Sequence, residues 1–149
     1  MVVALRGVRD EDLPLFFEHQ LDPDATAMAA FPARDRDAFM AHWARIRRDE
    51  TVILRSVLCE ELVVGNVVSW ENEGERYVGY WIVKEYWGKG IASAALASFV
   101  GELTTRPLHA RVAKHNVASR RVLEKCGFAV SGEATGGDVE ELLLLLDGG

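Results

Sequence analysis

Two glycines, Gly88 and Gly90, stand between an alternating segment and an alanine-rich one, and this junction limits the possible folds more than any other part of the chain. Residues 77–83 alternate as a β-strand does, and residues 91–103 have the apolar spacing of an amphipathic helix. Glycines have no Cβ atom and so allow a sharp turn between the two segments. The first N–H groups of the helix point back at this loop with the positive end of the helix dipole, and such an arrangement binds phosphate.

The loop does not fit the two best-known phosphate motifs. It lacks the third glycine of a dinucleotide-binding fingerprint, and Lys89 is followed by Gly90 rather than by the Ser or Thr of a P-loop. Taken alone, a Gly-x-Gly turn is equally consistent with a plain strand-to-helix connection. The phosphate interpretation therefore depends on a second stretch further along the chain.

The periodicity of the whole chain predicts one mixed α/β (α+β) domain over residues 1–149. With 149 residues, of which 49% are hydrophobic and 27% charged, the chain is long enough to bury a proper core. The expected order is β-α-α-β-β-β-α-β-α-β-β, a largely antiparallel sheet of about seven strands with four helices and a later βαβ crossover. Strands are expected at 2–6, 52–58, 62–70, 77–83, 108–112, 128–133 and 139–146 (the last two around Gly132, Gly136 and Gly137), helices through Leu13 and Phe17 and at 34–48, 91–103 and 116–126, and a loop at 22–33.

Charge and cysteine content restrict the partners and the compartment. The net charge of −6 argues against nucleic acid, and no apolar run approaches the roughly 20 residues of a membrane helix. The N-terminus has no signal-peptide layout. Cys59 and Cys126 lie far apart and form no Cys-x-x-Cys pair, so we expect no metal or redox site and a reduced, cytoplasmic protein. We expect a monomer or a homodimer.

The charges are unevenly distributed along the chain. Glu71, Glu73 and Glu75 cluster at one predicted hairpin, whereas residues 109–125 contain five Lys or Arg residues against Glu124 alone. A cationic region near a phosphate-binding loop suits an anionic cofactor, and acidic surface elsewhere suits a cationic substrate. Both are also consistent with ordinary solvated faces.

The second informative stretch runs from Asn116 to Phe128. Asn116 is a good N-cap and Gly127 a good C-cap for the helix between them, and capping alone explains both residues. The helix nevertheless follows the glycine loop and its helix by a single strand. Ligands of open α/β sheets bind at the carboxyl ends of such neighbouring strands.

Together the two stretches resemble the GNAT superfamily of acyl-CoA-dependent N-acyltransferases. Tyr-Trp-Gly-Lys-Gly-Ile-Ala at 86–92 is followed by Asn-x-x-Ser-Arg-Arg-Val-Leu-Glu-Lys-x-Gly-Phe at 116–128, as in RimJ/RimL-type acetyltransferases. The opening Leu-Arg-x-x-Arg-x-x-Asp-Leu at 5–13 and Val-Gly-Asn at 64–66 are similar to that group as well. The resemblance spans nearly the whole chain and implies a GNAT fold, acetyl-CoA as co-substrate, no metal and an amine-bearing acceptor.

The resemblance assigns the cofactor contacts residue by residue. The loop at 87–92 matches the segment that holds the pyrophosphate through backbone amides, with Trp87 at a position that is often Gln or Arg. The end of the preceding strand matches the edge where the pantetheine arm pairs and where a backbone N–H can polarise the thioester carbonyl. Lys89 and Arg120 are either phosphate contacts or solvent-exposed. The expected cofactor-binding residues are Ile82, Val83, Trp87, Gly88, Lys89, Gly90, Ile91, Ala92, Ser93, Asn116, Ser119 and Arg120.

The same resemblance leaves the proton-transfer residues incomplete. Many family members carry a tyrosine acid at the position of Leu123, and some carry a carboxylate base near Tyr77. We therefore name Ser119 as the catalytic hydroxyl and Glu71, acting through water, as the catalytic carboxylate. Glu71 also fits a solvated surface residue, and a histidine beside a helix cap, such as His115, is more typically structural than catalytic.

Two other classes of function stay open at this point. A CoA-binding regulatory module of weak or lost catalysis would explain the absent tyrosine and strand carboxylate. A nucleotide-binding fold of another kind would explain the glycine loop alone. The leading hypothesis is transfer of an acetyl group from acetyl-CoA by direct attack of a primary amine, on a small molecule or a protein N-terminus.

Overall fold

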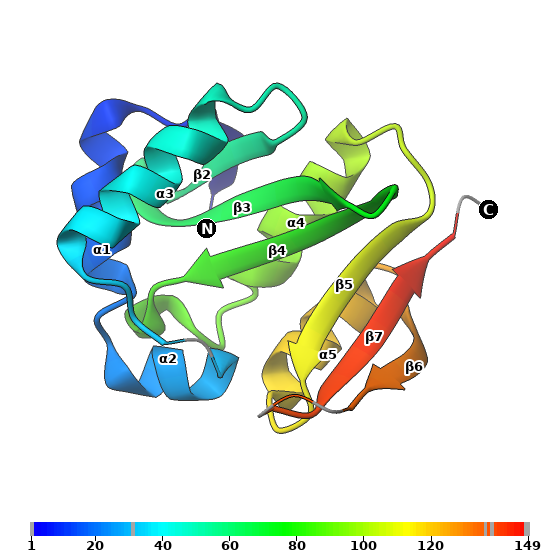
Figure 1. The fold of residues 1–149 in the computed structure, drawn as a ribbon. Helices are drawn as coiled ribbons and strands as arrows, with labels where there is room; N and C mark the ends of the chain where they lie inside the picture. Colours follow the sequence, from blue (N-terminus) through cyan, green and yellow to red (C-terminus); the bar gives the residue numbers. More distant parts are fainter. Residues whose placement is uncertain (1, 31, 136, 138, 148–149) are drawn as a thin grey trace.

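The computed structural model describes residues 2–30, 32–135, 137 and 139–147. Its centre is a twisted seven-stranded sheet in the order β1-β2-β3-β4-β5-β7-β6, antiparallel throughout except between β4 and β5 (Figure 1). This confirms the predicted fold class. Gly132 lies in β6, and Gly136 lies outside the described residues. The strands are β1 (Val3–Arg6), β2 (Ile53–Cys59), β3 (Leu62–Asn72), β4 (Glu75–Ile82), β5 (Leu108–Ala113), β6 (Ala129–Ala134) and β7 (Glu141–Leu146).

Five α-helices accompany the sheet in the described residues, whereas the sequence predicted four. The additional helix, α2 (Pro23–Ala29), occupies the segment expected to be a loop. The Asp22 carboxylate caps it by accepting from the Asp24 amide, and Pro23 sits in the first turn, where no N–H is needed. Proline therefore starts a helix here instead of preventing one. The others are α1 (Leu13–His19), α3 (Arg36–Arg48), α4 (Ile91–Glu102) and α5 (Val117–Lys125), with 3-10 turns at Asp10–Asp12 and Lys84–Tyr86.

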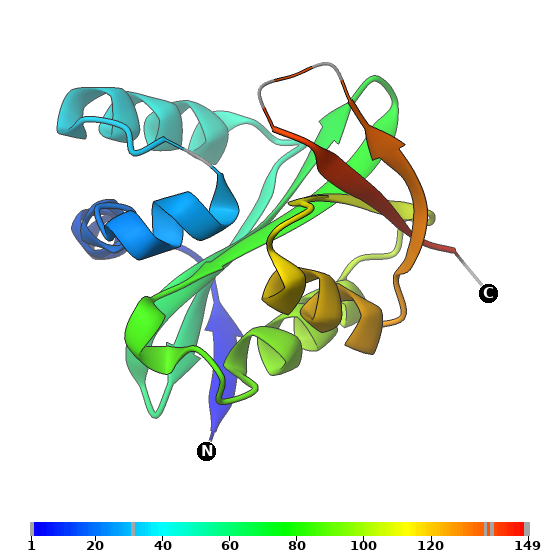
Figure 2. The same cartoon turned by 90° about the horizontal axis from the view of Figure 1, so that it is seen from below.

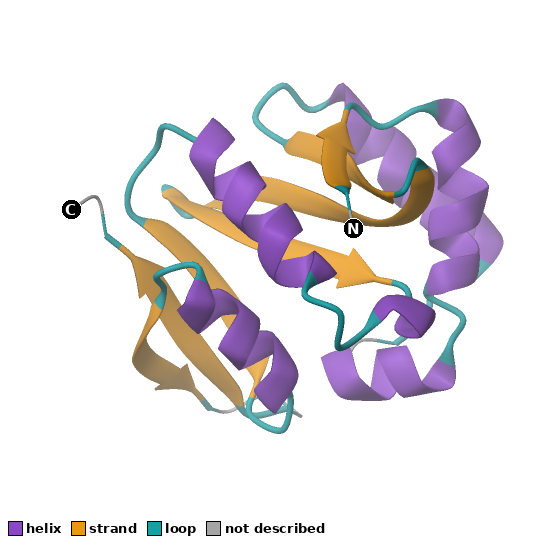
Figure 3. Ribbon diagram, turned by 180° about the vertical axis from the view of Figure 1, so that it is seen from behind, coloured by secondary structure: helices purple, strands orange, loops and turns teal. Residues whose placement is uncertain are grey.

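The helices cover the two faces of the sheet separately (Figures 2 and 3). Helices α4 and α5 lie over one face, and the larger core beneath them includes Ala95 and Phe99, which the helical spacing placed inward. Helices α1, α2 and α3 lie on the other face, where Phe16, Phe39 and Trp43 form a smaller aromatic core. Among the described helices, none has the length and apolar character that a membrane span requires.

Asp12 ties the first strand to the helical face. Its carboxylate accepts two hydrogen bonds from the Arg6 guanidinium at 2.6 and 2.9 Å, one from the Arg9 amide at 2.9 Å and one from the Ser56 hydroxyl at 2.7 Å. Burial alone would raise the pKa of Asp12, but these hydrogen bonds outweigh it and lower the pKa to about 2. The network explains the spacing of Arg6, Arg9 and Asp12 near the start of the sequence.

Strands β4 and β5 separate soon after they meet. Their parallel pairing is recorded only for Arg76 with Leu108 and Tyr77 with His109 among the described residues. Beyond this point the two strands diverge, and the sheet opens into two arms (Figure 1). The β-strand edges inside the opening therefore carry backbone groups that another molecule can pair with.

Candidate functional site

The first of two cavities, of about 290 Å³, lies at the separation of β4 and β5. Residues 78–82 of β4 and 110–113 of β5 form its walls, and α5 contributes one side. The Val83 N–H donates to the Val64 carbonyl oxygen at 2.9 Å, so Val83 uses its own amide within the sheet. Because antiparallel hydrogen bonds alternate, the amide of Ile82 then points away from β3 and toward the opening. Ile82 is thus the residue at this end that can offer an N–H.

The glycine loop lies at the mouth of this cavity and is held to the end of β4. The Trp87 indole Nε1–H donates to the Ile82 carbonyl oxygen at 2.8 Å. Gly88 and Gly90 have φ angles of +76° and +79°, in the left-handed region that favours glycine. A Cβ atom at either glycine would meet no atom within 4 Å, so the backbone here faces open space. The loop can therefore bring its amides close to a bound group.

Helix α4 begins directly at the end of the loop, with Gly90 as its N-cap. The Ala94 amide makes the first intrahelical hydrogen bond, to the Gly90 carbonyl at 3.1 Å, and the amides of residues 91–93 precede it. Such leading amides have no intrahelical acceptor. The Ile91 side chain is 1% exposed, so only its backbone can contact a ligand. Loop and helix together form an anion site built from backbone.

The two cations predicted beside this anion site both have protein neighbours. The Lys89 Nζ lies 5.3 Å from the centre of the Tyr86 ring, and Arg120 pairs with Glu124 at 3.4 Å. Both pairs lie near the surface, where such contacts are weak. Lys89 and Arg120 therefore remain available to an anion that approaches the loop.

Asn116, Ser119 and Tyr80 meet inside the first cavity. The Asn116 Oδ1 caps α5 by accepting from the Ser119 amide at 3.1 Å, as the sequence predicted. The Tyr80 hydroxyl donates to the Ser119 Oγ at 3.0 Å, and burial raises the pKa of Tyr80. Leu123, which is 4% exposed, lines the same cavity. A tyrosine from β4 thus stands near Ser119, although the α5 position holds leucine.

Sequence analysis missed Tyr80. The residue alternates with Val78 and Ile82 along β4, so a phenol falls among apolar positions that face α4 and α5. That polar tip in an apolar stripe was a usable signal, because a buried tyrosine hydroxyl normally has a partner. The partner itself lies 39 residues further along the chain and was not visible in the local pattern.

The second cavity, of about 590 Å³, lies between the sheet and helices α1, α2 and α3. Trp81 and Ala29 line both cavities, so the two adjoin at this point. Glu71 lines the second cavity and pairs with Arg76 at 3.2 Å. Glu71 stands opposite Arg76 in the sheet, four residues along β4 from Tyr80, which corresponds to about 13 Å. The structure therefore does not bring Glu71 and Ser119 together.

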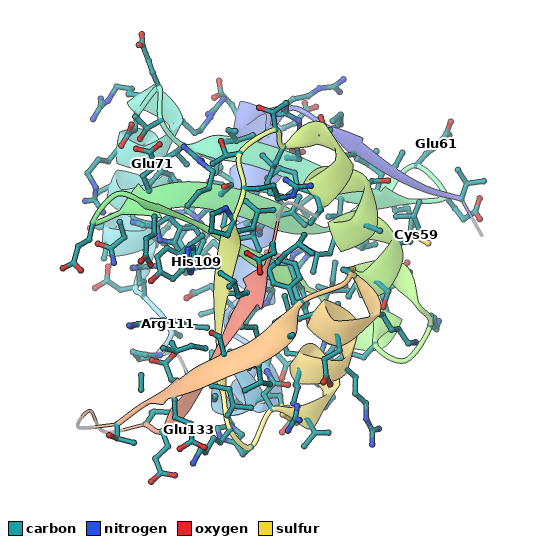
Figure 4. All side chains as sticks on the ribbon, turned by 90° about the vertical axis from the view of Figure 1, so that its right-hand side faces the viewer. Cys59, Glu61, Glu71, His109, Arg111 and Glu133 are labelled. Carbon is teal, nitrogen blue, oxygen red and sulfur yellow. The ribbon has the colours of Figure 1, made fainter. Side chains whose placement is uncertain are left out.

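The basic segment predicted at 109–125 is largely neutralised by acids from the last strands. Lys114 pairs with Glu133 at 3.0 Å and Glu140 at 3.5 Å, and Arg111 lies 3.9 Å from Glu141. Hydrogen bonding to Glu133 raises the pKa of Lys114. Arg111 and Glu133 are labelled in Figure 4, with Glu71 and His109 further toward the β3–β4 hairpin. Counting charges along residues 109–125 alone overestimated the positive patch.

The remaining candidates have structural roles. The His115 Nε2 lies 2.9 Å from the Ala27 carbonyl oxygen, which can only accept, so the ring holds α2 against the start of α5. Lys84 contacts Asp24 at the other end of α2. Both Cys59 and Cys126 are free thiols. The described residues contain no cluster of His, Cys, Asp or Glu that could hold a metal ion.

Comparison with known families agrees with this geometry. Residues 3–129 match the family described as "Acetyltransferase (GNAT) domain". The chain belongs to this family, as its motifs implied, and acetyl-CoA-dependent N-acetyl transfer is the activity class that the membership defines. No curated protein sequence matches the chain. Neither the CoA-binding regulatory module nor a nucleotide-binding fold of another kind is favoured.

Several solved acetyltransferases share the fold. The spermidine N-acetyltransferase from Vibrio cholerae, in complex with CoA and spermine, superposes with a TM-score of 0.84 at 17% identity over 97% of this chain and 95% of that chain. The aminoglycoside acetyltransferase AAC(6')-Ib, in complex with coenzyme A, gives 0.83 at 17% identity over 99% and 95%. Mycobacterium smegmatis RimJ, in complex with CoA-disulfide, gives 0.81 at 22% identity over 99% and 82%. At these identities the likeness establishes the fold.

Proposed function

We propose that the first cavity binds acetyl-CoA and that a primary amine attacks its thioester there. The observation that carries this proposal is the backbone anion site formed by the glycine loop and the start of α4, at the mouth of a cavity that leads to Ser119. The pyrophosphate would lie on the amides of 88–92, and the pantetheine arm would pair with the open edge of β4. The Asn116 amide group, whose oxygen caps α5, would face the arm.

The chemistry requires that protons move in both directions. An amine of pKa near 10 arrives mostly as ammonium and must lose a proton before it attacks the carbonyl carbon. The new C–N bond forms as the carbonyl π electrons move to oxygen, and the Ile82 N–H is the donor nearest to that developing charge. Collapse of the tetrahedral intermediate breaks the C–S bond and releases the thiolate of CoA.

Ser119 is the proposed partner of that thiolate. Because the Tyr80 hydroxyl donates to the Ser119 Oγ, the Ser119 hydrogen is left to point elsewhere, and the sulfur is the acceptor we assign to it. The raised pKa of Tyr80 makes the phenol a poor proton source for a thiolate of pKa near 8.5. Tyr80 is therefore a positioning residue. Glu71 would take the amine proton through water that fills the second cavity.

The binding site can be tested at Gly90. Gly90→Asp places a carboxylate beside the pyrophosphate, whereas Gly90→Asn has nearly the same shape without the charge, and both residues tolerate a left-handed backbone. Calorimetric titration with acetyl-CoA should show an affinity loss of about 100-fold or more for the Asp variant and much less for the Asn variant. Equal affinities of the Asp variant and the wild type would refute the anion site.

A further inference from the structure

The second cavity is walled mainly by aromatic side chains. Phe16 comes from α1, Phe39 and Trp43 come from α3, and Trp70 and Trp81 come from the neighbouring strands β3 and β4. With about 590 Å³ the cavity has the size of a site for a small organic molecule. Its composition suits a bulky apolar group, since aromatic side chains bury large areas and pack against flat or branched carbon skeletons.

The charges around this cavity do not suit a polycation. Glu71 pairs with Arg76, and the Asp49 carboxylate accepts from the Thr51 amide at 2.9 Å and from the Thr51 hydroxyl at 2.7 Å. Arg34 lines the cavity as well and adds positive charge. A substrate with several ammonium groups would need several uncommitted carboxylates in such a site, and both lining carboxylates already have donors.

Two polar side chains on the floor of the cavity have no partner among the described residues. Asn66 is 9% exposed, and no hydrogen bond of its side-chain amide is recorded. The Trp81 Nε1 is buried and unpaired. Asn66 and Trp81 are direct cross-strand neighbours in the sheet. Buried polar groups are normally hydrogen-bonded, and both of these can donate, so the floor is suited to a ligand oxygen that accepts.

We infer that the acceptor is a monoamine that carries a large apolar side chain and an uncharged carbonyl oxygen next to the amine. The apolar group would enter the aromatic walls, and the carbonyl oxygen would lie on Asn66 and Trp81. The amine would reach the junction of the two cavities, which Trp81 lines from both sides. An aromatic α-amino amide and a peptide N-terminus with a large apolar first residue share this chemistry. The inference rests on the proposed acetyl transfer.

The test compares four amines with acetyl-CoA. Phenylalaninamide has both features, phenethylamine lacks the carbonyl, glycinamide lacks the apolar group, and spermidine is a polycation. With kcat/KM referred to the free-amine form, phenylalaninamide should exceed each of the others by about ten-fold or more. A tripeptide with N-terminal phenylalanine identifies the source, because a higher kcat/KM than the amide points to peptides and a lower one to small amides.

Variants of Asn66 separate the proposed contact from the intrinsic reactivity of each amine. Asn66→Ala should lower kcat/KM for phenylalaninamide about ten-fold and leave phenethylamine within about two-fold. Asn66→Asp keeps the shape and should discriminate against the carbonyl at least as strongly. Asn72→Ala, at an exposed position of the same strand, is the matched control and should change neither substrate. Thermal melting of each variant verifies the fold.

The outcomes distinguish this inference from the proposed function. Preference for spermidine, or an equal loss for phenylalaninamide and phenethylamine in Asn66→Ala, overturns the acceptor class while acetyl transfer stands. Binding of acetyl-CoA without acetylation of any amine in the panel overturns both. A selective loss for phenylalaninamide in both Asn66 variants supports the carbonyl contact.

Discussion

The two cavities differ in what forms them. The cavity between β4 and β5 offers backbone amides from the glycine loop and α4, whereas the cavity under α1, α2 and α3 offers side chains from five separate elements. Backbone groups serve a constant ligand such as a diphosphate, because every residue carries an N–H. Side chains from distant elements can be exchanged one at a time, which suits the part of the site that selects the acceptor.

This contrast predicts that the helical half depends on buried side-chain contacts for its stability. Asp12→Asn should destabilise the protein by about 3 kcal/mol, because it removes the charge that pairs with Arg6 in a site where Asp12 is 1% exposed. Asp10→Asn is the matched control. Asp10 pairs with Arg47 but its side chain is 93% exposed, so the loss should stay below about 1 kcal/mol. Urea unfolding of both variants measures the two losses, and equal losses would contradict the network.

The pH dependence of the same network has a definite sign. The pKa of Asp12 in the folded protein is about 2, below its ordinary value of 3.8, so its ionised form contributes stability above about pH 4. This contribution should disappear as the pH falls from about 4 to 2. Unfolding measured across that range should show the difference between wild type and Asp12→Asn shrinking toward zero. A difference that stays constant would mean that the carboxylate charge is not the source of the stability.

How far the sequence predicted each half follows from the same contrast. Gly88, Gly90 and Asn116 were recognisable because a turn and a cap depend on residues within a few positions. The role of Tyr80 was not, because its partner Ser119 comes from another element. The charge of residues 109–125 was overestimated for the same reason, since the acids that pair with it belong to β6, β7 and the segment between them. Local motifs therefore predicted where the cofactor binds better than what surrounds it.

The glycine of Val64-Gly65-Asn66 shows how a recognised motif can lack a visible reason. A Cβ atom at Gly65 would lie 2.0 Å from the Trp81 carbonyl oxygen, so the two strands approach too closely for any side chain there. This approach also brings Asn66 and Trp81 side by side on the cavity floor. The sequence contained both residues, but their proximity required the strand register.

Proton transfer at the junction of the cavities sharpens the comparison, because it combines a strand residue with a helix residue. Ser119→Ala should lower kcat about ten-fold if the hydroxyl protonates the thiolate. Tyr80→Phe, which keeps the ring, should lower kcat by less, with the KM for acetyl-CoA nearly unchanged. In the Ser119→Ala background Tyr80→Phe should have no further effect, because Tyr80 acts through Ser119.

The control for this cycle is Tyr77→Phe, since the Tyr77 hydroxyl only reaches the exposed Glu75 at 3.3 Å. Profiles of kcat against pH for wild type and Ser119→Ala with a fast acceptor complete the test. Superimposable profiles would show that the thiolate leaves unprotonated and that Ser119 is a cofactor contact. Additive effects of Ser119→Ala and Tyr80→Phe would remove Tyr80 from the positioning role.

The smallest expected effect separates two functions of one side chain. Asn116 caps α5 through its Oδ1, and no partner of its Nδ2 is recorded among the described residues. Asn116→Asp should keep the cap and the melting temperature, because aspartate caps equally well and favours a helix N-terminus. It replaces the donor with a negative charge beside the departing thiolate, so kcat/KM for acetyl-CoA should fall about three- to ten-fold. Asn116→Ala loses both functions and should also lower the stability by about 1 kcal/mol. If Asn116→Asp matches the wild type in turnover as well as in melting temperature, Asn116 serves the helix alone, and the cofactor half would then depend on backbone groups even more completely than its cavity walls indicate.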